Sequence, residues 1–180
     1  MEANNSTHQE KPTAAPEAGI LGRIVVALGQ VFAVGILLIA LILVIEVILR
    51  YVFNKPTIWA HETVIFINAT AFIFGGLYAT ARNAHIRVTI VYDLLVGQWR
   101  RWSDVLISLS CCVASITFAY AAWKGVKRAI FTPAGDLRLE TTGSAWNPPT
   151  PGLTKLFLLA VLVVMALQFF ILSISYFRKR

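Results

Sequence analysis

The sequence lacks ionisable side chains near the middle of its four longest apolar runs, which are residues 24–45, 63–81, 105–123 and 156–177. Each run has about the 20 apolar residues that a helix needs to cross the hydrocarbon core of a membrane. Chains that carry ions or charged solutes usually keep acidic or basic residues at membrane depth. The absence therefore predicts a membrane protein without a transport pathway of its own.

Cysteine and histidine are also scarce, with two and three copies. Cys111 and Cys112 are neighbours, so they point in different directions on a helix and offer neither a disulfide framework nor a metal cage. His8, His61 and His85 all lie outside the apolar runs, which argues against haem ligation between helices. No catalytic triad or phosphate-binding glycine loop occurs either. We therefore expect no enzyme activity, metal or cofactor in this chain.

Acidic residues are the minority of the charges, with nine against 16 basic residues and a net charge of +7. The basic residues flank the apolar runs and form no stripe, which indicates contact with membrane lipids and not with nucleic acid. Arg100-Arg101, and Arg178-Lys179-Arg180 directly after the last run, are typical of the cytoplasmic side of a membrane. We expect both termini to be cytoplasmic.

The runs predict an all-α integral membrane protein with four transmembrane helices, at approximately residues 24–49, 63–81, 105–123 and 155–177. Residues 1–22 are polar and predict a disordered cytoplasmic tail, so that residues 23–180 form one compact four-helix membrane domain. Residues 82–104 carry a partial apolar stripe, which predicts a short amphipathic segment lying at the interface between helices 2 and 3. The proline and glycine residues within 124–155 predict an irregular connection.

Polar residues gather at the ends of the predicted helices. Glu46 and Arg50 lie four apart with the acid first, a spacing that favours an ion pair on a helix. Two interpretations of Arg50 remain open: an anchor for the helix end, or a planar donor for a partner chain or a lipid phosphate. We expect Glu62 to open the second helix, where its charge complements the macrodipole, and Trp59 to lie at the membrane interface.

Small residues repeat at close-packing spacing in two of the runs, and such residues let helices approach one another in membranes. They are Ala71, Gly75 and Ala79 in the second run and Cys111, Ser115 and Ala119 in the third. The spacing predicts helix packing. It does not distinguish contacts within this chain from contacts with a partner.

Four segments around the first connection and the second helix occur in a familiar order: RYVFN at 50–54, WAHE at 59–62, GG at 75–76 and RNAHIRV at 82–88. In this order and spacing the chain resembles the small membrane subunit of tripartite ATP-independent periplasmic (TRAP) transporters, the DctQ-like family. The resemblance covers roughly residues 24–177 in architecture and residues 50–95 in motifs. Two departures are visible: His61 stands where the family often has an acid, and Thr89 stands where it often has Asp.

The resemblance implies a four-helix small scaffold subunit of the bacterial inner membrane that binds a much larger permease subunit. In that family the permease carries the substrate and sodium, and a periplasmic substrate-binding protein delivers an organic acid. The residues of this chain that match the family pattern become candidates for assembly or for anchoring to lipids. They are Arg50, Trp59, Glu62, Arg82 and His85.

Two other functions remain as alternatives. A membrane anchor of a respiratory or redox complex would need histidines embedded in the helices, and the sequence has none there. A small homo-oligomeric transporter would need polar residues along a pathway, for which Gln30, Asn68 and Gln168 are the candidates. Amides in membranes more often join helices to one another.

Overall fold

The computed structural model describes residue 14 and residues 18–82, 98–132 and 135–178 of the chain. These residues form four helices, α1 (Gly19–Tyr51), α2 (Ile58–Ala81), α4 (Gln98–Ile130) and α5 (Thr150–Arg178), and no strand. All four helices are long and apolar enough to cross a membrane. The prediction of an all-α protein with four membrane-spanning helices is confirmed.

The helices are longer than the apolar runs that predicted them. α4 extends from residue 98 to 130 instead of from 105 to 123, and α1 begins at Gly19, so the last residues assigned to the tail are helical. α4 continues past the apolar run because its last turns tolerate basic residues, among them Lys127 and Arg128. The ammonium groups of Lys124 and Lys127 lie over the rings of Tyr120 and Trp123, at 4.7 and 5.5 Å from the ring centroids. Cations in the last turn also complement the helix macrodipole.

Two predicted segments fall largely outside the described residues. These are the disordered tail, except for residue 14 and residues 18–22, and the amphipathic segment, except for residue 82 and residues 98–104. Residues 98–104 form the first turns of α4.

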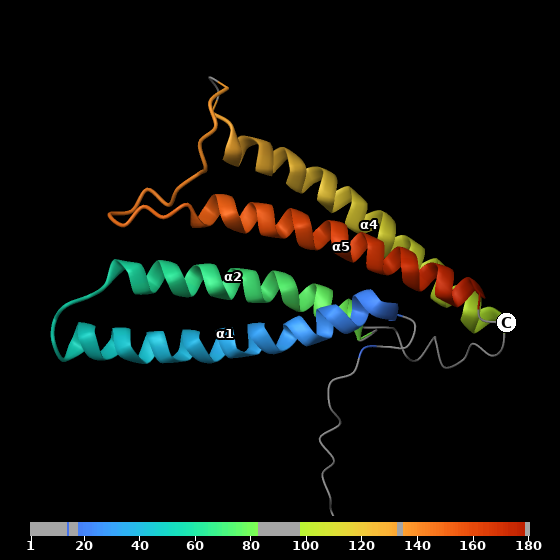
Figure 1. Cartoon of the computed structure of the whole chain (residues 1–180), viewed down its shortest axis with the longest axis horizontal. Helices are drawn as coiled ribbons and strands as arrows, with labels where there is room; N and C mark the ends of the chain where they lie inside the picture. The colour runs from blue at the N-terminus through green and yellow to red at the C-terminus, as the bar shows by residue number, and fades with distance from the viewer. Residues whose placement is uncertain (1–13, 15–17, 83–97, 133–134, 179–180) are drawn as a thin grey trace, which may run out of the picture.

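The helices lie in a row in the order α1, α2, α5, α4 (Figure 1). α1 packs on α2, α2 on α5, and α5 on α4, while α1 barely touches α5. The domain is therefore a row, not the compact unit that its length suggests. α2 and α5 form the centre of the row, and α1 and α4 form its edges.

Aromatic side chains join the three helices on one side of this row. The ring of Phe32 on α1 stacks on Phe74 of α2, with centroids 4.1 Å apart and planes 12° apart, and lies 6.1 Å from the ring of Phe157 on α5. Nearer the amino terminus of α1, a Cβ on Gly29 would lie 2.5 Å from Cε2 of Tyr78. The absence of a side chain at Gly29 thus permits the close approach of α1 and α2.

The connection between α4 and α5 has no helix or strand among its described residues, as predicted, yet it is well anchored. The backbone N–H of Arg138 donates to the carbonyl of Ile130 at 2.8 Å, and that of Glu140 donates to Ala129 at 2.8 Å. A Cβ on Gly152 would lie 3.3 Å from the backbone nitrogen of Glu140. The chain therefore folds back along the end of α4 and then rests on the start of α5.

Candidate functional site

A buried carboxylate ties the end of α1 to the loop that follows it. Glu46 is 6% exposed. Its Oε1 accepts hydrogen bonds from Arg50 Nη2 at 2.7 Å and from Arg50 Nε at 3.3 Å. Its Oε2 accepts the backbone N–H of Thr57 at 3.2 Å and also the Thr57 hydroxyl. A charge in apolar surroundings needs such partners, and Glu46 has them from both sides.

The local backbone explains how Thr57 reaches Glu46. After α1, Asn54 adopts a left-handed conformation with φ of 49°, and the N–H of Lys55 donates to the carbonyl of Leu49 at 2.9 Å. This bond and the bond from the Val52 N–H to the Ile48 carbonyl at 2.9 Å satisfy two of the last carbonyls of α1. Thr57 then precedes α2 in an extended conformation, and its side chain makes no capping bond to α2. Its hydroxyl is thereby free to bind Glu46.

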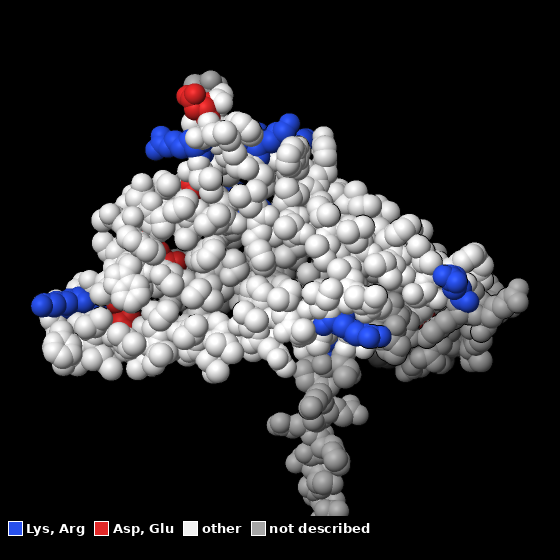
Figure 2. Space-filling model, in the orientation of Figure 1, with Lys and Arg blue, Asp and Glu red and all other residues white. Residues whose placement is uncertain are grey.

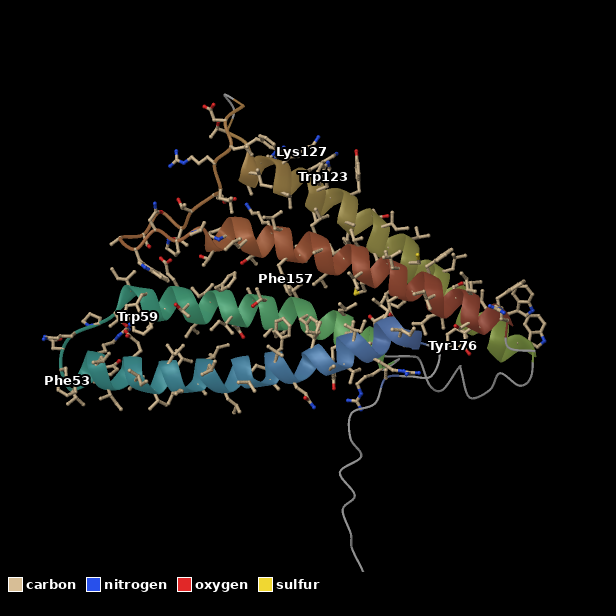
Figure 3. All side chains as sticks on the ribbon, in the orientation of Figure 1. Phe53, Trp59, Trp123, Lys127, Phe157 and Tyr176 are labelled. Atoms are coloured by element: carbon tan, nitrogen blue, oxygen red, sulfur yellow. The ribbon has the colours of Figure 1, made fainter. Side chains whose placement is uncertain are left out.

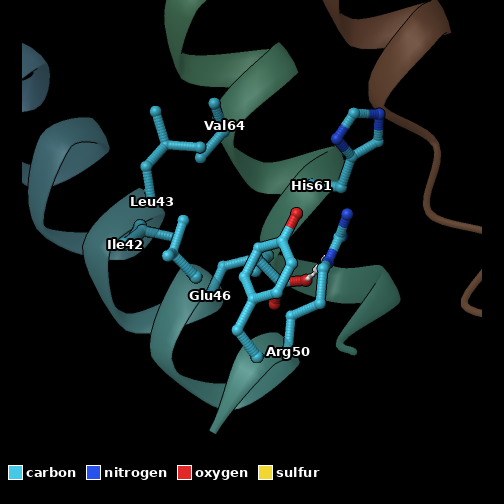
Figure 4. A pocket seen from close by; sticks show the side chains of 9 residues that line it. Ile42, Leu43, Glu46, Arg50, His61 and Val64 are labelled. Carbon is cyan, nitrogen blue, oxygen red and sulfur yellow. Dashed lines mark hydrogen bonds and ion pairs between the residues drawn. The ribbon is translucent and has the colours of Figure 1, made fainter. Parts of the chain in front are cut away.

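A pocket of about 220 Å³ opens beside this ion pair, between α1 and α2 (Figure 4). One side of the pocket is apolar and the other carries the polar groups. The apolar residues are Ile42, Leu43, Val47, Ala60 and Val64, and the polar ones are Glu46, Arg50, Tyr51 and His61. Figure 4 shows the Arg50 side chain rising from α1 toward His61 of α2. His61, the first departure from the family pattern, thus lies on the rim of the pocket.

Glu62 has a different role from the predicted one. It lies in the second turn of α2 instead of at its start, and no acidic residue occupies the first turn. Its side chain is nearly buried, and its Oε2 accepts a hydrogen bond at 3.0 Å from the hydroxyl of Thr142. Glu62 therefore connects α2 to the distant 131–149 connection. Nearby, Lys155 of α5 forms an ion pair with Glu140 of the same connection.

The remaining predicted end residues are spread over the molecule. Trp59 is half exposed and lies with Phe53 at the end where α1 and α2 meet (Figure 3). Arg82 lies at the opposite end of α2, with its guanidinium 5.7 Å from the centre of the Tyr78 ring. His85 and Thr89 lie outside the described residues. The structure thus brings Glu46 and Arg50 together and separates them from Arg82.

The small residues of α2 lie toward the outside. Gly75 is exposed, and a Cβ built on it would meet no atom within 4 Å. Ala71 and Ala79 are half-buried, whereas Phe74 and Leu77 are buried against the neighbouring helices. Within the chain, α2 packs on its neighbours through bulky side chains such as Phe74 and Leu77, and no other part of the described chain covers the surface at Gly75.

The small residues of α4 lie closer to its neighbour α5. Ser115 is 2% exposed, and Cys111 and Ala119 are half-buried. Cys111 packs beside a buried cluster that joins the two helices, and the Cys112 thiol within that cluster donates to the carbonyl of Ala166 at 3.5 Å. This side of α4 therefore contributes to packing within the chain.

The three amides of the apolar runs do not form a path. Gln30 and Asn68 are exposed on α1 and α2, whereas Gln168 of α5 is fully buried. Gln168 Nε2 donates to the carbonyl of Ala18 at 3.2 Å, and its Oε1 has no hydrogen-bond partner within the described residues. Gln168 therefore joins α5 to the start of α1. Over the same residues, no group of three or more His, Cys, Asp or Glu side chains could hold a metal ion.

A broad central part of the face in Figure 2 carries no Lys, Arg, Asp or Glu side chain. Lys and Arg side chains lie at the two ends and along the upper and lower edges, and the red Asp and Glu atoms show only in the left-hand part and at the top, while the rest of the face is uncharged. This distribution suits a protein whose middle lies in hydrocarbon and whose ends meet the lipid headgroups.

Three features of the site were missed from the sequence. Thr57 and Thr142 bind carboxylates that lie 11 and 80 residues away in the chain. The spacing of neighbouring residues does not predict hydrogen bonds between residues so far apart in the sequence. Gly29 had one usable signal, because Gly22 and Gly29 lie seven residues apart. A Cβ on Gly22 would lie in ordinary contact with the carbonyl of Ala81 on α2, at 3.6 Å, so both glycines are on the side of α1 that faces α2. A seven-residue repeat is the spacing of a continuous helix-packing seam.

Comparison with known proteins adds two findings. The family model of the DctQ component of tripartite ATP-independent periplasmic transporters matches residues 39–179. The chain is also similar to the C4-dicarboxylate TRAP transporter small permease protein DctQ of Vibrio cholerae serotype O1, with 30% identity over 79 residues. That alignment covers 43% of this chain and 34% of the relative, so the chain matches about a third of the relative's length.

Proposed function

Because the chain belongs to the family of the DctQ component of TRAP transporters, we propose that it is the small scaffold subunit of such a transporter. In this proposal it supports a large permease subunit that couples the uptake of an organic acid to sodium. The chain itself holds neither the sodium nor the substrate. The family is a transporter component and not an enzyme.

The observation that carries this proposal is the position of the polar groups. The described carboxylates of the helices are engaged at helix ends, as Glu46 and Glu62 are, and the amides within the spans are isolated from one another. A transport pathway needs a connected set of polar groups through the membrane. A subunit that positions another protein does not need one.

The edge helix α1 supports the role of a partner-binding scaffold. Only 6% of its most apolar stretch is buried within the chain. Large side chains such as Leu37 and Val31 are more than half exposed. Because lipid is as apolar as leucine, helix association in membranes depends on shape and on hydrogen bonds. α1 offers a long accessible surface for shape fitting and one exposed amide, Gln30, within its apolar span. We propose that transmembrane helices of the permease pack along α1.

We further propose that the chain is a multi-pass protein of the bacterial inner membrane with both termini in the cytoplasm. Four spans bring the two termini to the same side, and the basic residues after α5 favour the cytoplasm for that side. The Glu46 pocket and the 131–149 connection would then face the periplasm. A periplasmic substrate-binding protein would approach the assembled complex from there.

The substrate of the proposed transporter is an organic acid. The relative from Vibrio cholerae is named for C4-dicarboxylates, and dicarboxylates are therefore the first compounds to test in an uptake assay. The identity of the substrate depends on the permease and the binding protein, which this chain would serve.

A pull-down in mild detergent tests the proposal. A tagged chain, expressed from its native locus, is expected to co-purify with a much larger polytopic membrane protein. Arg50→Ala is expected to reduce that yield, whereas Arg178→Ala removes an exposed basic residue at the other end and serves as the matched control. Recovery of a haem protein, or of the tagged chain alone from intact membranes, would contradict the proposal.

A further inference from the structure

The pocket between α1 and α2 includes Arg50 and combines features that the packing of the two helices alone does not require. It has an apolar side and a polar side, and it opens where the two helices meet their connecting loop. We propose that this pocket binds a phospholipid, with the lipid phosphate at Arg50 and the adjoining acyl chain against the apolar side.

Arg50 is the group that would hold the phosphate. Its side chain is 50% exposed although it is paired with Glu46. The two bonds to Glu46 use Nε and Nη2, and within the described residues no hydrogen bond uses Nη1. A guanidinium is a fork of five N–H donors, so the outer edge stays available for a second acceptor. Glu46 holds the fork in place, which spares the ordering cost that a free Arg side chain would meet on binding.

Glu46 itself does not compete for the ligand's cationic groups. Its two oxygens already accept hydrogen bonds from Arg50 and Thr57, and its side chain is 8% exposed. It therefore acts as a positioning residue for Arg50. Two further groups that can donate hydrogen bonds border the pocket: the imidazole of His61 and the hydroxyl of Tyr51. Both residues are exposed, so a phosphate at Arg50 could also receive their N–H or O–H.

The apolar side explains why the ligand should carry a hydrocarbon chain. Leu43 and Val64 line the pocket from α1 and α2 on the side that leads toward the middle of the membrane. At the outer end, half-exposed Trp59 and exposed Phe53 have the character of an interfacial aromatic belt (Figure 3). Arg50 therefore lies at the level of the phosphates, and Leu43 lies at the level where acyl chains begin. A free phosphate would match Arg50 and leave the apolar side unused.

The test is native mass spectrometry of the purified full chain in a mild non-ionic detergent, with added phosphatidylethanolamine or phosphatidylglycerol. We expect one retained phospholipid per chain at low lipid concentration. Arg50→Ala is expected to weaken binding by roughly tenfold or more, the scale of a lost charge-assisted hydrogen bond. Arg50→Lys keeps the charge and loses the fork, so its binding should lie between the two.

A second variant leaves the ion pair intact. Leu43→Trp places a bulky side chain at the apolar side and should also displace the lipid, while Leu41→Trp, on the same helix and outside the pocket, should not. Lys55→Ala removes the same charge from the same end of the molecule and is the control for unspecific attraction. Far-UV circular dichroism checks that each variant keeps its helices.

Two further probes separate the ligand chemistries. Diacylglycerol lacks the phosphate and inorganic phosphate lacks the acyl chains, so each should bind far more weakly than a phospholipid. The proposal is wrong if diacylglycerol binds as tightly as phosphatidylethanolamine, or if Lys55→Ala weakens binding as much as Arg50→Ala. It is also wrong if inorganic phosphate displaces the lipid at comparable concentration, because the site would then be one for free phosphate.

Discussion

The contact between Gly29 of α1 and Tyr78 of α2 allows a quantitative prediction about the α1–α2 interface. A Cβ at Gly29 would lie 2.5 Å from Tyr78 Cε2 and 2.7 Å from Cδ2. Real Cβ atoms essentially never approach so closely, so Gly29→Ala forces the ring or the helix to move. Gly75→Ala is the matched control, because a Cβ there meets no atom within 4 Å.

The two substitutions share the gain in helix propensity, and only Gly29→Ala adds the contact with Tyr78. Overpacking a well-packed interface costs about 1–3 kcal/mol. Replacing Gly by Ala within a helix returns up to about 1 kcal/mol at both positions. The free energy of unfolding should therefore differ between the two variants by about 1–3 kcal/mol, with Gly29→Ala the less stable. The contribution of helix propensity cancels in this difference.

Steric trapping in detergent micelles measures the free energy of unfolding for both variants. In a Tyr78→Ala background the penalty of Gly29→Ala should disappear, since the ring atoms that clash are gone. The double-mutant cycle then assigns the cost to this pair of residues. Equal stabilities of Gly29→Ala and Gly75→Ala, or a penalty that persists without the Tyr78 ring, would refute the proposed close approach of the helices.

Three further predictions concern the polar contacts. Glu46→Gln should lower the thermal midpoint and speed proteolysis of residues 52–57, because the amide keeps one acceptor oxygen and can accept from Arg50 or from Thr57 but not from both. Unchanged cleavage would argue against the link between α1 and the loop. Thr142→Val should lower the free energy of unfolding by about 0.5–1 kcal/mol and speed amide hydrogen exchange in the 131–149 connection, because it removes the hydrogen bond to Glu62. An unchanged exchange pattern would show that this bond does not hold the connection in place. Gln168→Leu should change the unfolding free energy by less than about 1 kcal/mol, because it removes one hydrogen bond and one buried oxygen without a partner; a loss well above that value would show that the bond to Ala18 dominates.

The fold was predictable because hydropathy reports a property of each helix alone. Length and apolar content are sufficient to identify a membrane span, and all four helices were found this way. The ends of the helices were harder to predict, since α4 continues through Lys124 and Lys127 beyond the apolar run. The row was not predictable at all. Which helix neighbours which depends on shape, such as the fit of Gly29 to Tyr78, and hydropathy contains no such information.

The candidate site was predictable only where its residues are close in sequence. The Glu46–Arg50 pair follows directly from helical spacing and is present at 2.7 Å. The interpretation of Glu62 was wrong because the start of α2 lies earlier than the apolar run indicates. Its true partner, Thr142, reaches it only through the folded connection. Contacts of this kind require the three-dimensional arrangement of the helices.

The two carboxylates have a common consequence for α2, which is the helix that packs on both α1 and α5. Glu46 links α1 to Thr57 at the entry of α2, and Glu62 links the second turn of α2 to the connection that leads into α5. Lipid provides no hydrophobic incentive to keep these helices together, so hydrogen bonds at the membrane edge carry a larger share of the task than they would in water. The same end of the row holds the pocket at Arg50, and a bound phospholipid there would close the gap between α1 and α2 from outside. A rigid end of this kind is what a scaffold needs if a larger partner moves against it.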